Sequence, residues 1–357
     1  MAASVQFFSR LMRKKTHRPW IRLGFVALSD CAPIIMAQEL GLYAKYGVGV
    51  ELHREVGWAT IRDKIVYGEL EAAHAPAGLV VAASCGLGSI QRECLAGLIM
   101  SLNGNAITLS QNLWDSGVRD GRALRERVIR GDRLHPFAVV HPYSAHSVLL
   151  RHWLRSHRIE PDRDVQIVVV PPAQVHANLK AAHLDGYCVG EPWNSLAVLS
   201  RLGWCIATSD ELAPRHPEKV LMVRKDFAET SEHDHLALIA ALIEACQFCQ
   251  RAENRERLLE TLAQPQYVGA PIQALRMGMS GTFDYGNGRV EKHSSFHIFS
   301  GEDVNAPTPA KAEWVVRNLI SSGIVKDPSL VPFERAPEWF RADIFAQASH
   351  LIATTHS

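Results

Sequence analysis

The sequence has 357 residues, is 47% hydrophobic, and carries 38 Lys and Arg against 37 Asp and Glu, a formal net charge of +1. A chain of this length and apolar content can bury a sizeable core, and usual domain sizes favour two lobes over one. The balanced charge argues against direct binding to nucleic acid or an anionic membrane, and no apolar run is long enough for a membrane span. Any charge specificity must therefore be local.

The first twenty residues contain a cluster of basic side chains, but their apolar runs are too short for a signal peptide and no cleavage pattern follows. We expect a disordered basic leader over residues 1–20 and a cytoplasmic protein. The seven cysteines are an odd number and fit reduced thiols. Cys246 and Cys249 have CxxC spacing within a helical pattern. Core packing is favoured for them over a redox or metal role, because no second CxxC completes a zinc site.

The predicted elements alternate along the chain. A strand-like run at 21–28 precedes a helical pattern at 32–47, a strand at 48–56, a helix at 60–70, and a final strand and helix within 72–85. Alternation of period-two and period-3.6 patterns is typical of parallel α/β architecture.

A second set of the same kind begins at residue 136 and ends near 190, and a return strand follows at 219–227. We predict a discontinuous lobe 1 from residues 21–115 and 216–350 and a lobe 2 from residues 116–215. The Gly-, Ser- and His-rich stretch 281–308 is expected to be a surface loop. No phosphate-binding glycine motif and no internal repeat is present.

Two predicted helix starts follow strands directly. Trp58 and Thr60 open one helix after Gly57, and Ser144 is a plausible N-cap for another that includes His146. The free N–H groups and positive dipole end of such a helix start attract a small anion. A Trp there could equally be a hydrophobic staple, and a lone His a structural core residue.

Other polar residues are weak signals when taken singly. Asn103 and Asn105 flank a glycine, which is ordinary turn chemistry. Glu191 and Trp193 follow a strand end. Lys219 opens the return strand, where it could supply positive charge to an anion, although most lysines are simply solvated.

Taken in order, these stretches resemble the nitrate- and bicarbonate-binding proteins of ABC-type transporters and their cytoplasmic sensor relatives. The matching segments span about residues 21 to 350 and are LGFVALSDCAP, GLYAKYGV, WATIRDKIVYGELEAAH, LNGNAITLS, HPYSAHSVLLRHWL, VVVPPAQVHANLKAAHLDGYCVGEPWN and HPEKVLMV. The resemblance implies a type II periplasmic-binding-protein fold, with two α/β lobes that close over an anion.

The resemblance also implies the ligand and its residues. Nitrate or nitrite would be held by Trp58, Asn105, His146 and Lys219, although the amide at position 105 is commonly a longer Gln in the transport proteins. The supporting cleft residues would be Thr60, Asn103, Ser144, Glu191 and Trp193. Bicarbonate-binding relatives carry a carboxylate and recruit calcium where this chain has Lys219, so nitrate or nitrite is favoured, with no metal and no cofactor.

Without a visible export signal, the chain is most similar to the cytoplasmic NasS-type nitrate/nitrite sensors. The resemblance then implies a partner, an ANTAR-type (NasT-like) RNA-binding antiterminator, which is sequestered by the open protein and released when the anion closes the hinge. Lys219→Glu is expected to abolish the nitrate response while preserving partner binding.

Two alternatives stay open. The chain could be the solute-binding component of an ABC-type nitrate transporter whose export signal is not seen, or an enzyme, because the same fold hosts a thiamine-precursor synthase. The stretch CQFC does not reproduce that enzyme's cysteine-rich iron motif, so no enzymatic activity is expected.

Overall fold

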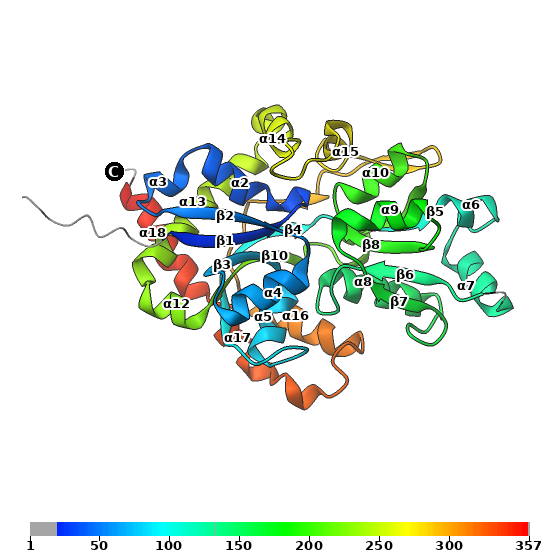
Figure 1. Ribbon diagram of the computed structural model, residues 1–357, viewed down its shortest axis with the longest axis horizontal. Helices are drawn as coiled ribbons and strands as arrows, with labels where there is room; N and C mark the ends of the chain where they lie inside the picture. The colour runs from blue at the N-terminus through cyan, green and yellow to red at the C-terminus, as the bar shows by residue number, and fades with distance from the viewer. Residues whose placement is uncertain (1–19, 132, 356–357) are drawn as a thin grey trace, which may run out of the picture.

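The computed structural model describes residues 20–131 and 133–355. The basic leader predicted for residues 1–20 lies, apart from Trp20, outside the described residues. Two α/β lobes lie side by side, each built on its own sheet with helices packed on it (Figure 1). The predicted α/β class and two-lobed architecture are confirmed.

The first lobe contains a six-stranded sheet in the order β13-β4-β10-β3-β1-β2. Strands β1, β2 and β3 are parallel, whereas β10 lies antiparallel to both β3 and β4. The bounds of its strands are β1 Ile21–Val26, β2 Val50–Glu55, β3 Ala72–Pro76, β4 Cys94–Asn103, β10 Pro217–Arg224 and β13 His297–Ile298.

The second lobe repeats this arrangement in a five-stranded sheet in the order β7-β6-β8-β5-β9. Strands β6, β7 and β8 are parallel, and β5 is antiparallel to β8 and β9. The bounds of its strands are β5 Asn105–Ser110, β6 Pro136–Val139, β7 Gln166–Val169, β8 Gly186–Gly190 and β9 Gly203–Thr208.

The helices cover the faces of these sheets (Figure 1). Those before β10 are α2 Ala32–Glu39, α3 Leu42–Lys45, α4 Trp58–Tyr67, α5 Ala77–Ser84, α6 Gln111–Asp115, α7 Gly121–Arg130, α8 Ala145–Ser156, α9 Val175–Lys180, α10 Trp193–Leu199 and α11 Ser209–Leu212. Those after it are α12 Lys225–Thr230, α13 Glu232–Gln250, α14 Arg255–Leu262, α15 Ile272–Met277, α16 Pro309–Ser321, α17 Ala336–Trp339 and α18 Ala342–Thr355.

The first crossing between the lobes occurs at Gly104, not after residue 115 as expected. Residues 94–110 are continuously buried and look like one run, but Asn103 (φ 60°) and Gly104 (φ 95°) adopt left-handed backbone. This break directs β5 into the second sheet. A further difference concerns the β11–β12 hairpin (Thr282–Gly286 and Arg289–Lys292), which packs against α10 and β9 of the second lobe. The expected surface loop at 281–308 is therefore partly a structured hairpin.

Cys246 and Cys249 are fully buried in α13, which packs against α2 and α18. Burial raises the pKa of both thiols and keeps them protonated and unreactive. The structure thus supports core packing. Within residues 20–131 and 133–355, no helix combines the length and apolarity that crossing a bilayer requires.

Candidate anion-binding site

The four residues predicted to bind the anion are brought together between the lobes. Trp58 opens α4 after β2, and His146 lies in the first turn of α8 after β6. Asn105 and Lys219 lie at the starts of antiparallel strands β5 and β10, so they reach the edge at which the parallel strands end. Trp58 is 1% exposed and the other three are 0% exposed.

Two buried carboxylates that sequence reasoning missed hold this cluster together. Lys219 Nζ lies 2.8 Å from Asp30 Oδ2 and 2.5 Å from Glu218 Oε1. Glu218 also accepts a 2.7 Å hydrogen bond from Asn105 Nδ2 and lies 3.1 Å from His146 Nε2. Glu218 therefore links the first lobe to Asn105 and His146 of the second.

The sequence does not predict that Glu218 lies beside Lys219, because regular alternation along a strand places neighbouring residues on opposite faces. Here the pairing of β10 with β4 shifts register on both sides of Lys219. The irregularity lets Glu218 and Lys219 both be fully buried, and it is a feature of strand pairing that the sequence HPEK does not reveal.

Two further histidines complete the surroundings of the carboxylates. His74 Nε2 lies 2.9 Å from Asp30 Oδ1, and the His74 ring packs 5.1 Å from the Trp58 ring. His216 Nε2 lies 3.1 Å from Glu218 Oε2. Lys219 Nζ is 5.4 Å from the centroid of the Trp58 ring, so the indole forms one wall beside the buried charges.

The charges in this cluster are strongly coupled. Burial opposes ionisation of Asp30 and Glu218, but the Lys219 ammonium and the adjacent histidines hold the pKa of both carboxyls well below the usual range. Burial likewise opposes the Lys219 charge, and the two carboxylates outweigh it and raise the Lys219 pKa. Burial lowers the pKa of His146 and His74 and favours their neutral forms.

This charge balance corrects the expected role of Lys219. The lysine is already paired with two carboxylates, so it is not a free cation that meets an anion alone. A carboxylate of the protein, Glu218, lies between Lys219 and His146, where a bound anion was expected. Counting only Asp30, Glu218 and Lys219, the cluster carries one net negative charge, and an incoming anion needs additional hydrogen-bond donors or a proton.

Four buried polar atoms of Trp58, Asn105 and His146 have no hydrogen-bond partner among the described residues: Trp58 Nε1, Asn105 Oδ1 and both ring nitrogens of His146. Of these, His146 Nε2 has an ion-pair contact with Glu218. Unpartnered buried groups are costly, so these atoms are candidate contacts for a ligand. Because His146 Nε2 faces a carboxylate, we assign its proton there, which leaves Nδ1 as an acceptor in the neutral ring. His146 Nδ1 can donate to an anion only after the ring takes up a second proton.

Ser144 and Asn103, two of the predicted supporting residues, shape the backbone of the cleft. Ser144 caps α8, since its hydroxyl accepts from Ser147 N at 3.3 Å, which confirms the predicted N-cap. Asn103 donates 2.9 Å hydrogen bonds to Asp210 and to the Ser295 carbonyl. These bonds stabilise the segment in which the chain passes from the first lobe to the second. Thr60 is half-buried in the first turn of α4.

The other two supporting residues join the lobes. The Trp193 indole donates to the Ala27 carbonyl at 3.2 Å, and the Glu191 carbonyl accepts from Ser29 N at 2.7 Å. Burial raises the pKa of the Glu191 carboxyl to about 7. Together with the contact of His146 with Glu218, these bonds join the two lobes across the cleft. In the described part of the chain, no cluster of three or more His, Cys, Asp or Glu side chains is placed to hold a metal ion.

A two-lobed α/β fold with a buried polar cluster between the lobes is that of a type II periplasmic-binding protein. Residues 14–263 match the NMT1-like family. The chain is 32% identical over 316 residues to the nitrate/nitrite binding protein NrtA of Synechococcus elongatus, covering 85% of this chain and 71% of that protein. The chain therefore belongs to the NMT1-like family.

Other relatives include ATP-binding proteins of nitrate and bicarbonate transport. The chain is 37% identical to the nitrate import ATP-binding protein NrtC of Synechocystis (89% of this chain, 49% of that protein) and 40% identical to the bicarbonate transport ATP-binding protein CmpC of the same organism (86% and 46%). It thus spans about half the length of these relatives. Among solved structures, the periplasmic nitrate-binding protein NrtA from Synechocystis PCC 6803 matches with a TM-score of 0.88 and 28% identity, covering 94% of this chain and 90% of that one.

Proposed function

We propose that the chain binds nitrate or nitrite between its two lobes, at Trp58, Asn105, His146 and Lys219. The observation that carries this proposal is the pair of unpartnered buried nitrogens, Trp58 Nε1, which is a donor, and His146 Nδ1, which becomes a donor when the ring is protonated, beside Lys219 at the lobe interface. The similarity of the chain to nitrate/nitrite binding proteins, in sequence and in fold, also supports the proposal.

Comparing nitrate with bicarbonate shows which groups of the site could select between the two anions. Nitrate can only accept hydrogen bonds, whereas the bicarbonate hydroxyl can also donate to an acceptor such as Asn105 Oδ1. The carboxylates of Glu218 and Asp30 are already engaged by Lys219 and by histidines, so they do not themselves select for a proton-donating ligand. Nitrate selectivity then depends on Trp58 Nε1 and on protonated His146.

The binding proposal is tested by isothermal titration calorimetry of the chain with nitrate, nitrite, bicarbonate and chloride. We expect saturable binding of nitrate or nitrite at pH 6, weaker bicarbonate binding and no response to chloride. His146→Gln should lose the binding, and His152→Gln, on the same helix but outside the cluster, is the matched control. Preferential bicarbonate binding, or equal loss in both variants, would contradict the proposal.

For the wider role, we propose a cytoplasmic sensor that sequesters an ANTAR-type RNA-binding antiterminator and releases it when the anion closes the lobes. The bonds that join Ala27 and Ser29 to Trp193 and Glu191 hold the lobes together in the arrangement seen here, which a ligand between the lobes can favour over an open state. Near-complete switching needs the closed state to be favoured by several kcal/mol, about 5 kcal/mol for a change from 1:99 to 99:1.

The alternative, a solute-binding component of an ABC-type nitrate transporter, is equally supported by the relatives. A pull-down of the tagged chain from its native lysate separates the two roles. A sensor retains a small RNA-binding protein without added anion and releases it with millimolar nitrate or nitrite but not chloride. Retention of a permease, or of no specific protein under any condition, would contradict the sensor role.

A further inference from the structure

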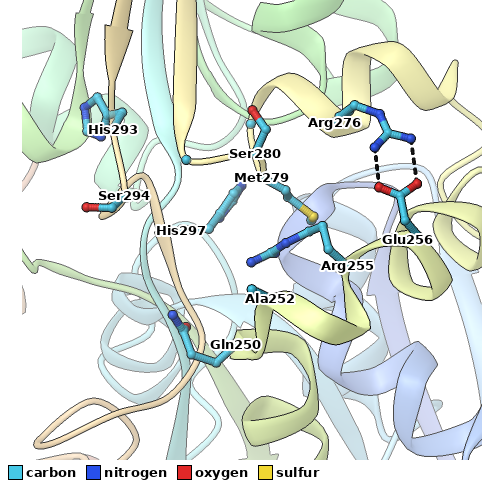
Figure 2. A pocket seen from close by; sticks show the side chains of 12 residues that line it. Gln250, Ala252, Arg255, Glu256, Arg276, Met279, Ser280, His293, Ser294 and His297 are labelled. Carbon is cyan, nitrogen blue, oxygen red and sulfur yellow. Dashed lines mark hydrogen bonds and ion pairs between the residues drawn. The ribbon is translucent and has the colours of Figure 1, made fainter.

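A second polar cavity adjoins the buried cluster at the junction of the lobes. The cavity has a volume of about 420 Å³. It is lined by the end of α13, the start of α14, and the segment that runs from α15 to β13, and it opens to solvent (Figure 2). Its size exceeds what nitrate itself needs, so it can hold an anion with part of its hydration water.

The cavity offers an arginine without a counter-ion. Arg255 opens α14 and points into the cavity, whereas neighbouring Arg276 is turned toward Glu256, with which it forms an ion pair (Figure 2). Within residues 20–131 and 133–355 no carboxylate pairs with Arg255, and burial lowers its pKa. A half-buried guanidinium with no carboxylate beside it is a natural contact for an oxyanion.

His297 lines this cavity on the side that adjoins the buried cluster. It is 7% exposed and has no hydrogen-bond partner for either ring nitrogen among the described residues. Its ring is stacked on Phe299 at 5.5 Å and rests on Gly104, where an added Cβ would lie 2.3 Å from His297 Cε1. Gly104 immediately precedes Asn105 of the buried cluster.

Charged groups of the cavity and of the buried cluster both act on the His297 ring. Burial, the main cause, lowers the pKa of His297 to about 4, and the charges of Asp30, Lys219, Arg255 and Glu218 also act on it. The ring is therefore close both to the carboxylates of the buried cluster and to the guanidinium of the cavity. The unpartnered ring nitrogens are placed to contact an anion that passes from one side to the other.

We propose that this cavity is a second anion site, in which Arg255 first captures nitrate or nitrite and from which the anion reaches the buried cluster past His297. The inference rests on the proposed nitrate or nitrite binding. A transient site on the path lowers the barrier for entering and leaving alike, so its loss slows both rates and leaves the equilibrium affinity nearly unchanged.

The test is stopped-flow Trp fluorescence of the full chain mixed with nitrate, in parallel with calorimetric Kd values. Arg255→Gln should lower the association and dissociation rates by a similar factor of about ten, with a weaker salt dependence of association. The matched control is Arg257→Gln, which removes the same charge from an exposed residue of the same helix that packs over Phe248 and does not line the cavity. Rates in Arg255→Gln that equal those of Arg257→Gln would overturn the proposal.

A second variant guards against misfolding. His297→Phe keeps a ring stacked on Phe299 but removes the nitrogens, so both rates should fall again with little change in Kd or Tm. Unchanged rates, or a Kd that changes because only one of the two rates changes, would show that His297 has no role on the path and contradict the proposal.

The inference can also be separated from the nitrate proposal itself. If calorimetry shows no nitrate binding, crystals of the chain soaked in bromide report on the cavity alone. An anomalous peak between Arg255 and His297, lost in Arg255→Gln, supports a second anion site, and no peak there refutes it.

Discussion

Replacing Lys219 by Met tests how much the Lys219 charge contributes to the free energy of unfolding by pairing with Asp30 and Glu218. The substitution preserves an unbranched side chain of similar length but leaves Asp30 and Glu218, both 0% exposed, without their shared cation. Removing one partner of a buried ion pair typically costs about 3–5 kcal/mol, because the remaining charge stays desolvated. Lys219→Glu would add a third carboxylate, so we now expect it to destabilise the fold as well as to disturb anion binding.

The double variant Asp30→Asn/Lys219→Met makes the prediction sharper. Glu218 keeps contacts with Asn105, His146 and His216, whereas among the described residues Asp30 keeps only its contact with His74. Neutralising Asp30 should therefore recover about half of the loss, a coupling of about 2 kcal/mol. Without the lysine, burial raises the pKa of the carboxyls, so the defect should shrink as pH falls from 8 to 5.

The assay is urea unfolding followed by circular dichroism at both pH values. The matched control is Lys225→Met, which removes a surface lysine that pairs with Glu93 at 2.9 Å and should cost less than about 1 kcal/mol. If Lys219→Met costs no more than Lys225→Met, or if the Asp30→Asn change adds to the loss, the reasoning about the buried cluster is wrong.

Three further predictions concern single residues of the cleft. Burial raises the pKa of Glu191 from 4.5 to about 7, so its contribution to stability is lost as pH rises through that range. Glu191→Gln should then stabilise the fold by up to about 3 kcal/mol above pH 7 and by less than about 1 kcal/mol at pH 5, measured by urea midpoints. Burial lowers the pKa of His146 in the free protein, and a bound anion raises it. Nitrate affinity should therefore fall by up to about tenfold per pH unit between the His146 pKa of the free protein and that of the nitrate complex. A nitrate affinity that calorimetry shows to be independent of pH would refute the proton coupling. Trp58→Phe keeps the ring beside His74 but removes the indole N–H, so nitrate affinity should fall about tenfold with little change in Tm, and an unchanged Kd would exclude Trp58 as a donor.

Much of the architecture could be predicted from local patterns. Alternating strand and helix periods indicated parallel α/β lobes, and the Ser144 cap was readable because a Ser before a helical run satisfies free N–H groups in a recognisable way. The convergence of Trp58, Asn105, His146 and Lys219 could be expected once the strands were placed, because the carboxyl ends of parallel strands and the starts of antiparallel ones share one edge of a sheet.

The sequence by itself determined the class of fold, the two helix starts that face the cleft and the residues gathered there, because these depend on local periodicity and capping. Only the tertiary structure decided the charge of the site. A register shift in β10 turns Glu218 inward beside Lys219, and η1 (Ser29–Cys31) brings Asp30 against the same lysine. The position of His297 between Arg255 and the buried cluster likewise depends on the tertiary structure, because the pairing of β13 with the end of β4 joins residues far apart in the chain. Such long-range pairings and shifts of register leave no local pattern, so the electrostatics of the site follow from the fold alone.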